Sequence, residues 1–174
     1  MQTRRQFFLS GCATAVAAVT VLTTLASRRS RAAGLANPSA GDEHFEFVRT
    51  DEQWHQILSD NQYAILRRSA TERPYSSPLN SEHRPGVFTC AGCQLALFSS
   101  ATKFDSHTGW PSFWAPMEHA VATHEDDSFG AERTEVHGRR CGGHLGHVFD
   151  DGPQPTGLRY CMNGLALGFT PAPV

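Results

Sequence analysis

The sequence predicts a mainly β domain that begins with two short helices. From residue 74 onward, Pro and Gly interrupt every apolar run, so only short strands with turn residues between them fit the pattern. Before that point, two helix-capping patterns stand directly ahead of apolar residues at helical spacing. No internal repeat is visible. A stretch of this length, residues 46–170, is enough to build a single core.

The first 36 residues have the layout of an export signal. Two arginines at positions 4 and 5 precede an uncharged run, residues 6–27, that is rich in Ala, Val, Thr and Leu. Residues 3–9 resemble the twin-arginine signal, which exports folded proteins across the bacterial inner membrane. We therefore expect a periplasmic protein. The alternative is an uncleaved membrane anchor. The many Thr and Ala residues disfavour it, because each contributes little to the free energy of insertion into a membrane.

Charge separates this leader from the rest of the chain. Residues 1–36 contain five Arg and no acid, so ten basic residues face seventeen acidic ones in the remainder. A body with a net charge of −7 is a poor nucleic-acid binder, and no nucleic-acid partner is expected. The predicted organisation is a signal peptide at 1–36, a linker at 37–45, a domain at 46–170 and a tail at 171–174.

The two helices are predicted from capping boxes. Thr50 with Gln53 forms the first box, and Ser59 with Gln62 forms the second. The apolar residues that follow are Trp54, Ile57 and Leu58 after the first box, and Tyr63, Ile65 and Leu66 after the second. The predicted strands then cover residues 86–89, 94–98, 119–123, 134–139, 146–149, 159–162 and 165–169.

Three cysteines form a candidate metal site. Cys90 and Cys93 lie in a Cys-x-x-Cys at the turn between two predicted strands, as in zinc ribbons, although such a pair also fits a disulfide or a redox couple. Cys141 is a third candidate ligand. The position that would complete a second Cys-x-x-Cys is Gly138. His137 is next to it and could serve as the fourth ligand instead, as could water, although neighbouring residues of a strand point to opposite faces.

Another group of residues has the character of a reactive thiol site. Cys161 is two residues from Arg159, so both side chains lie on one face of a strand, and a nearby guanidinium favours the thiolate. His144 and His147 stand three apart in a Gly-rich stretch whose backbone freedom can bring both rings to one side. On the residues alone, Cys161 also fits a buried apolar role, and the histidines also fit metal ligands or surface residues.

Several motifs in order resemble the B-type peptide-methionine (R)-S-oxide reductases. The matching segments are TERP at 71–74, CAGC at 90–93, TKFDS at 102–106, GWPSF at 109–113, HLGHVF at 144–149 and RYCMN at 159–163. The resemblance runs from about residue 52 to residue 169. It implies two antiparallel sheets in a β-tent arrangement, N-terminal helices, and a zinc knot away from the active site.

The resemblance also implies a reaction. The Cys161 thiolate attacks the sulfoxide sulfur of methionine sulfoxide in oxidised proteins, and His144 and His147 hold and protonate the leaving oxygen. Methionine is released and Cys161 becomes a sulfenic acid. A methyl pocket together with donors for the oxygen selects one sulfoxide epimer.

Further site residues follow from the same resemblance. Asp151 and Arg159 are expected to orient the acid and to set the field of the thiolate, and Asn163 to contribute hydrogen bonds. Trp110 and Phe149 are expected to contact the substrate, with the Trp110 ring against its terminal methyl.

The chain departs from the family pattern at two positions. Gly138 replaces the third zinc cysteine, which leaves Cys90, Cys93 and Cys141 as the expected ligands of a weakened structural zinc site. Thr108 occupies the position of the resolving cysteine. We therefore expect a thioredoxin-like protein or another external thiol to reset Cys161.

Two other functions are alternatives to the reductase. A non-catalytic zinc-ribbon binding module would lack Cys161 or one of the histidines, and all three are present. A Cys-His hydrolase needs an oxyanion hole, which the motifs do not locate, and the Trp110 pocket suits a thioether methyl better than a carbonyl.

Overall fold

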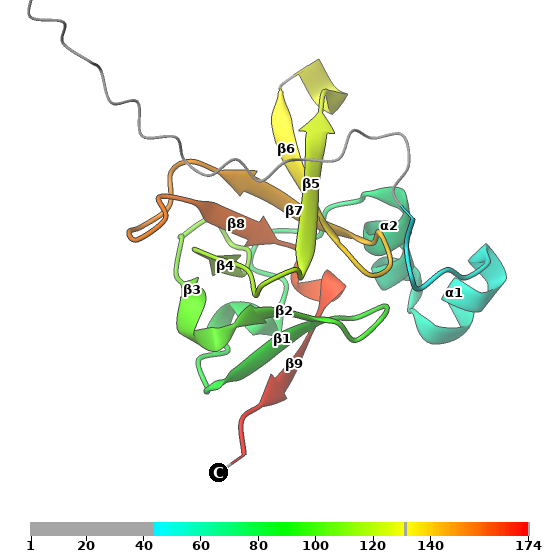
Figure 1. The fold of residues 1–174 in the computed structure, drawn as a ribbon, viewed down its shortest axis with the longest axis horizontal. Coiled ribbons are helices and arrows are strands. Elements are labelled where there is room, and N and C mark those ends of the chain that lie inside the picture. The colour runs from blue at the N-terminus through cyan, green and yellow to red at the C-terminus, as the bar shows by residue number, and fades with distance from the viewer. Residues whose placement is uncertain (1–43, 131, 174) are drawn as a thin grey trace, which may run out of the picture. The chain divides into compact units, whose positions relative to one another are not determined.

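A computed structural model describes residues 44–130 and 132–173. Its architecture confirms the predicted fold class, because two antiparallel sheets dominate and only two short α-helices are present within those residues (Figure 1). The predicted leader at 1–36, and most of the linker at 37–45, lie outside the described residues. None of the described helices is both long enough and apolar enough to cross a membrane.

Both predicted helices form where the capping boxes begin. Helix α1 spans Asp51–Ile57 and helix α2 spans Asp60–Arg68, and each N-cap side chain and each N3 glutamine make the reciprocal bonds of a capping box. The helices bury most of their apolar residues, namely Trp54, Leu58, Tyr63, Ile65 and Leu66. Ile57 is the exception and remains exposed.

The smaller sheet has three strands in the order β2-β1-β9. They span Gly86–Cys90 (β1), Ala96–Ser99 (β2) and Leu167–Pro171 (β9). Gln94 has a left-handed backbone with φ of 60° and belongs to the turn, so β2 begins two residues later than predicted.

The larger sheet has six strands in the order β3-β4-β8-β7-β6-β5. They span Lys103–Phe104 (β3), Ser112–Phe113 (β4), Val121–Asp126 (β5), Arg133–Gly138 (β6), His144–Phe149 (β7) and Arg159–Met162 (β8). Strands β3 and β4 were not predicted because two residues are too few for an alternating pattern. Short 3-10 helices cover Pro78–Ser81 (η1), Ser100–Thr102 (η2), Ser128–Gly130 (η3) and Gly164–Ala166 (η4).

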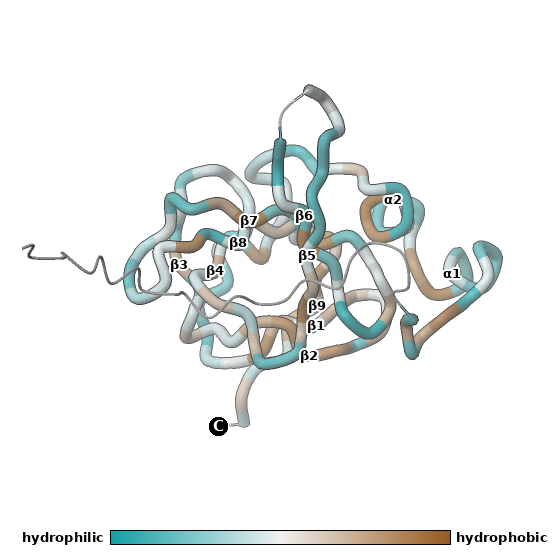
Figure 2. The backbone as a smooth tube through the Cα atoms, turned by 45° about the horizontal axis from the view of Figure 1, so that its top comes forward, coloured by the Kyte–Doolittle hydropathy of each residue, from teal (hydrophilic) through white to brown (hydrophobic). Residues whose placement is uncertain are grey.

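Aromatic rings from both sheets meet in the core. Phe113 of the larger sheet stacks on Phe98 of the smaller sheet with ring centroids 4.3 Å apart, and it meets Phe88 at 4.9 Å. Tyr160 and Met162 of β8 point into this core. Figure 2, which colours the backbone by hydropathy, shows hydrophobic segments of both sheets close together in this region. Because side chains alternate along a strand, Cys161 lies on the opposite face of the larger sheet.

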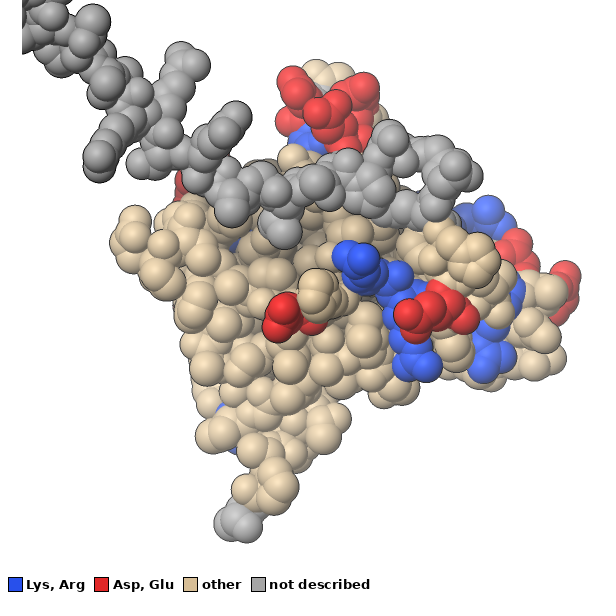
Figure 3. All heavy atoms as spheres, in the orientation of Figure 1, with Lys and Arg blue, Asp and Glu red and all other residues tan. Residues whose placement is uncertain are grey.

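The β5–β6 hairpin extends beyond the other strands of its sheet (Figure 1). Its outer part is hydrophilic (Figure 2), and acidic side chains gather at its tip (Figure 3). The acidic residues of this tip are Glu125, Asp126, Asp127 and Glu132. Asp126 is the only one of the four that is partly buried, so its surroundings differ from those of its neighbours.

Candidate active site and metal centre

A row of polar side chains crosses five strands of the larger sheet. Successive antiparallel pairings join His124 to Glu135, Glu135 to His147, His147 to Cys161, and Cys161 to Ser112. Residues directly opposite one another in an antiparallel pair have their side chains on the same face. The register of the sheet therefore brings the predicted nucleophile beside one of the predicted histidines.

A β-bulge brings the second histidine to the same face. His144 and His147 are an odd number of residues apart, so a regular strand would direct them to opposite faces. The pairing of β6 with β7 instead skips Leu145: Val136 pairs with Gly146, and the next residue of β6, His137, pairs with His144. The two imidazole centroids are consequently 5.5 Å apart.

Gly146 is required for the packing of β7 on β8. A Cβ atom at this position would overlap the carbonyl oxygen of Cys161. The absence of a side chain thus allows the backbone of β7 to approach the backbone that carries the nucleophile.

Each histidine is bound to its own carboxylate. The Nε2 atom of His147 lies 2.8 Å from Oδ2 of Asp126, and the Nδ1 atom of His144 lies 2.7 Å from Oε1 of Glu135. The second oxygen of Glu135 lies 2.9 Å from Nε2 of His124. His144 is almost completely buried, whereas His147 is half-buried.

These contacts shift the ionisation of the groups. Burial lowers the pKa of His147, which outweighs the opposing effect of its hydrogen bond to Asp126, so the neutral ring is favoured at rest. Hydrogen bonds from Ser128 and His147 hold the pKa of Asp126 well below its usual range. Burial would raise the pKa of Glu135, but the hydrogen bond to His144 and the nearby imidazoles lower it overall.

A hollow of about 140 Å³ opens over Cys161. It is lined by Thr71, Trp110, Arg133, Gly146, His147, Phe149, Cys161 and Asn163. Five of these were predicted site residues: Trp110, His147, Phe149, Cys161 and Asn163. Thr108 stands beside the hollow, and its Oγ1 lies 3.8 Å from Sγ of Cys161.

Three other predicted site residues lie outside this lining. His144 sits behind His147, while Arg159 and Asp151 form a separate pair with two hydrogen bonds of 2.7 and 2.9 Å. The bond to Asp151 raises the pKa of Arg159, and the proximity of Cys161 contributes as well. Arg159 also covers the ring of Phe149 at 4.2 Å. The carboxylate that contacts a pocket histidine is therefore Asp126, and the predicted orienting role of Asp151 stays a prediction.

Glu72 connects the helical segment to the site. Its carboxylate accepts hydrogen bonds from the backbone N–H groups of Gly164 at 2.6 Å and Leu165 at 2.9 Å. Its own N–H donates to Oδ1 of Asn163, and its carbonyl accepts from Nε1 of Trp110 at 3.2 Å. The side-chain amide of Asn163 in turn donates to the carbonyl of Leu145. Glu72 thus fixes both Trp110 and the chain that follows Cys161.

The three knot cysteines come from two turn regions: Cys90 ends β1, Cys93 lies in the turn between β1 and β2, and Cys141 lies between β6 and β7. The sulfur atoms of Cys90, Cys93 and Cys141 lie within 4.8 Å of one another, and all three residues are buried. Hydrogen bonds from the other two thiols lower the pKa of the Cys93 thiol to about 3. Three buried sulfur donors this close together can hold a metal ion, and thiolates suit zinc and other soft cations.

The fourth ligand position is open at Gly138. A Cβ atom there would lie 4.0 Å from Sγ of Cys141 and 3.9 Å from the carbonyl oxygen of Gly143, so a side chain would point toward the cluster without a clash. His137 points away, as strand alternation requires: its ring is 5.4 Å from that of His124 and 6.0 Å from that of Phe45. Among the described residues, His137 is not part of the cysteine cluster.

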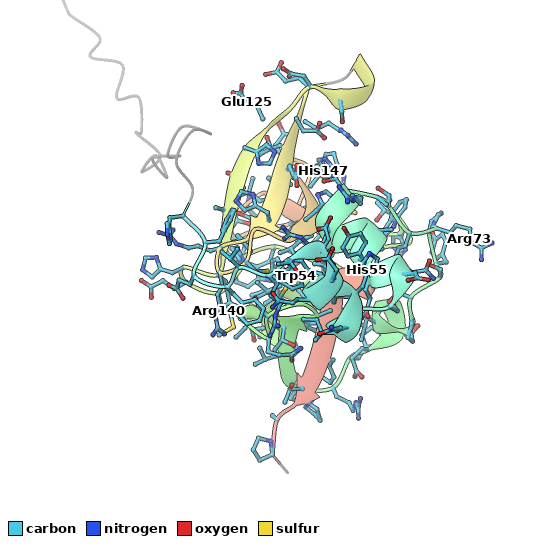
Figure 4. All side chains as sticks on the ribbon, turned by 90° about the vertical axis from the view of Figure 1, so that its right-hand side faces the viewer. Trp54, His55, Arg73, Glu125, Arg140 and His147 are labelled. Atoms are coloured by element: carbon cyan, nitrogen blue, oxygen red, sulfur yellow. The ribbon has the colours of Figure 1, made fainter. Side chains whose placement is uncertain are left out.

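Sequence reasoning missed Asp126, Glu135, Arg133 and Glu72 as members or neighbours of the site. Asp126 and Glu135 are acids in a hydrophilic hairpin, where charged residues are ordinarily solvated. Their only sequence signal is the two-residue alternation along β5 and β6, which places His124 with Asp126, and Arg133 with Glu135, on one face. Figure 4 shows His147 on the sheet and Glu125 at the end of the hairpin beyond it.

Comparison with known proteins gives consistent matches. The sequence profile of the SelR domain family matches residues 58–171. A protein of Methanosarcina mazei is 51% identical over 123 residues, which cover 70% of this chain and 88% of that protein. A protein of Bradyrhizobium diazoefficiens is 54% identical over 125 residues, 71% of this chain and 90% of that protein. A third, from Pseudomonas putida, is 52% identical over 124 residues, 71% of this chain and 93% of that protein. All three relatives are named peptide methionine sulfoxide reductase MsrB.

Proposed function

This chain belongs to the SelR domain family, and we propose that it reduces the R epimer of methionine sulfoxide in oxidised proteins back to methionine. The observation that carries the proposal is the hollow over Cys161, in which a thiol, an imidazole and an indole ring share one wall. A thiol supplies the electrons, an imidazole moves the proton, and an indole ring packs against a thioether methyl.

The chemical step begins at Cys161. Its thiolate attacks the sulfoxide sulfur, and the sulfur–oxygen bond breaks as the oxygen receives a proton from a histidine. The protonated oxygen moves to the Cys161 sulfur as the new sulfur–sulfur bond breaks, so the methionine sulfur gains two electrons and Cys161, which loses two, becomes a sulfenic acid. Arg159 lies on the same face of β8 as Cys161.

Epimer selection follows from the shape of the hollow. Trp110 and Phe149 form apolar surface for the methyl group, while His147 supplies the polar contact for the oxygen. Three different substituents around the sulfoxide sulfur, namely the oxygen, the methyl and the peptide side chain, then fit in one handedness only. Glu72 and Thr71 help to fix the Trp110 side of this arrangement.

The reset of Cys161 requires an external thiol. Thr108 lies beside the Cys161 sulfur, with its Oγ1 at 3.8 Å, and its hydroxyl cannot form a disulfide. The remaining described cysteines are Cys90, Cys93 and Cys141, which are buried together in the knot. One external thiol therefore attacks the sulfenic acid, which forms a mixed disulfide with Cys161 and releases water. A second thiol then attacks this mixed disulfide and frees the Cys161 thiol. A thioredoxin-like reductant would supply both.

Zinc is the proposed occupant of the knot. Cys90, Cys93 and Cys141 would hold it, and its role would be to stabilise the packing of the helices against β1 and β6. Arg67 and Arg140 donate to backbone carbonyls of Cys141 and Cys93, at 3.0 and 3.1 Å, and brace the same loops. No catalytic step involves this ion.

The proposed organisation places the reductase outside the cytoplasm. Residues 1–36 would act as a twin-arginine export signal and 37–45 as a linker, with the reductase domain at 46–170. Periplasmic location follows if the leader is removed, and membrane attachment if it is retained. Fractionation of cells that produce the full chain, compared with a variant carrying Lys at both Arg4 and Arg5, tests this: export should require the arginine pair, and equal export of both forms would contradict it.

The activity is tested with separate epimers. The purified protein, with dithiothreitol as reductant, should convert peptides that contain (R)-methionine sulfoxide and leave the S epimer unchanged. An ester and an amide substrate serve as controls for the hydrolase alternative. Conversion of both epimers at equal rates, or hydrolysis without reduction, would contradict the proposed function.

A further inference from the structure

We propose that Asp126 is a positioning residue for the reduction, which binds Nε2 of His147 so that Nδ1 can carry the Cys161 proton to the sulfoxide oxygen. This inference rests on the proposed function. It adds a residue from the tip of a surface hairpin to the catalytic arrangement, and it assigns separate tasks to the two nitrogens of one imidazole.

The geometry fixes the tautomer of His147. Oδ2 of Asp126 lies 2.8 Å from Nε2, and an ionised carboxylate can only accept a hydrogen bond, so Nε2 carries the proton. In the neutral ring the other nitrogen, Nδ1, then has a free electron pair. His147 lines the hollow and pairs directly with Cys161 across β7 and β8, so this nitrogen belongs to the ring that borders the substrate.

Asp126 is itself held by two residues besides His147. Nη2 of Arg133 lies 2.7 Å from Oδ2, and the backbone N–H of Ser128 donates to Oδ1 at 2.9 Å. The same Nη2 donates to Oγ of Ser128 at 3.1 Å, which closes the group. The two bonds to Asp126 favour its charged carboxylate and limit its rotation. A side chain near the end of a hairpin is thereby fixed well enough to orient an imidazole on the next strand but one.

The proton balance closes within the site. Neutral His147 takes the proton of the Cys161 thiol at Nδ1, which leaves a thiolate and an imidazolium whose charge Asp126 stabilises. The thiolate then attacks the sulfoxide sulfur, and Nδ1 returns the same proton to the oxygen as the methionine sulfur–oxygen bond breaks. The resulting hydroxyl group bonds to the Cys161 sulfur as the temporary sulfur–sulfur bond breaks. The products are a thioether and the sulfenic acid of Cys161, and no proton enters or leaves.

The surroundings of His147 set the expected pH dependence. The titratable and charged groups on this face of the four neighbouring strands are His124, Asp126, Arg133, Glu135, His137, His144, Arg159 and Cys161. Asp126 is the acid that contacts the ring directly. Without its charge the imidazolium is less favourable, so the limb of the rate profile that falls on acidification should move to lower pH, while the plateau rate drops.

The test compares two neighbouring acids of the hairpin tip. Asp126→Asn should lower the single-turnover rate with (R)-methionine sulfoxide by about 100-fold or more and move the acid limb down, since general acid–base catalysis contributes a factor of this order. Asp127→Asn makes the same chemical change at an exposed neighbour and should leave the rate unchanged. Asp126→Glu restores the charge on a longer side chain and should recover part of the rate and the position of the limb.

Several outcomes would overturn the inference. It is wrong if Asp126→Asn reacts as fast as Asp127→Asn, or if the rate falls while the acid limb stays in place and Asp126→Glu recovers nothing. If Asp126→Asn does not fold, the single-turnover rate and the pH of the acid limb in Asp126→Glu provide the test. If Asp126 acted only by filling space, the longer side chain of Glu would recover neither of them. Failure of the wild-type protein to reduce the R epimer would instead contradict the proposed function.

Discussion

Replacing Glu72 by Gln should destabilise the protein and impair the site at the same time. The carboxylate of Glu72 accepts two backbone hydrogen bonds, from Gly164 and Leu165, directly after the strand that carries Cys161. Glutamine keeps one acceptor oxygen but places an amide NH₂ against the second backbone N–H. One charge-assisted bond is therefore lost and the other becomes neutral.

The expected cost follows from these two bonds. Hydrogen bonds to charged groups contribute about 1.5–3 kcal/mol each, and a neutral bond about 1 kcal/mol, so the substitution should lower the free energy of unfolding by about 2–5 kcal/mol. That is a large part of the total stability of a domain, which is about 5–15 kcal/mol. Because Glu72 also holds Asn163 and Trp110, the single-turnover rate should fall as well.

Urea unfolding followed by circular dichroism measures the change. Glu118→Gln is the matched control, because the Glu118 side chain is 89% exposed and its substitution should change the free energy of unfolding by less than about 0.5 kcal/mol. If the Glu72 and Glu118 variants unfold at the same urea concentration with equal slopes, the reasoning about the buried carboxylate is refuted.

Three further changes test separate parts of the site. Thr108→Cys should convert the sulfenic acid into an intramolecular disulfide with Cys161, because the present Oγ1 is already 3.8 Å from that sulfur; free sulfenic acid at undiminished yield in this variant would contradict the geometry. Gly138→Cys should supply a fourth thiolate and slow the loss of zinc to a chelator severalfold, measured by release to a colorimetric indicator, whereas unchanged release would show that position 138 does not face the ion. Because the pKa of His147 is lowered in the folded protein, the unfolded chain binds a proton at this imidazole more readily. The free energy of unfolding should therefore fall as the pH drops below 6.5, the ordinary pKa of histidine, and His147→Asn should weaken this dependence in urea titrations at pH 5 to 8. An equally steep dependence in that variant would assign the effect to other groups.

Local patterns in the sequence were sufficient for the parts of the fold that depend on neighbouring residues. The two capping boxes act over three residues and predicted where α1 and α2 begin. The two-residue alternation of a strand placed Arg159 and Cys161 on one face of β8, opposite Tyr160 and Met162. The same rule argued against His137 as a fourth metal ligand without excluding it, and the structure places its ring beside those of His124 and Phe45.

Other parts depend on contacts that no local pattern contains. The bond from Asp126 to His147 spans 21 residues of sequence, and the bond from Glu72 to the backbone of Gly164 spans 92. The shared face of His144 and His147 results from a bulge at Leu145, which is set by the pairing register of β6 with β7. Gly-rich sequence permits such an irregularity but does not specify its position.

The most direct test of the account is a single turnover without reductant. Enzyme mixed with an equal amount of a peptide containing (R)-methionine sulfoxide should yield close to one methionine per protein molecule, and a sulfenic-acid probe should label Cys161 at close to one equivalent in the same sample. Cys161→Ser should give neither product, because a hydroxyl is far less nucleophilic than a thiolate. Methionine formed in the Cys161→Ser variant, or a disulfide of Cys161 with Cys90, Cys93 or Cys141 in place of the sulfenic acid, would contradict the one-cysteine mechanism.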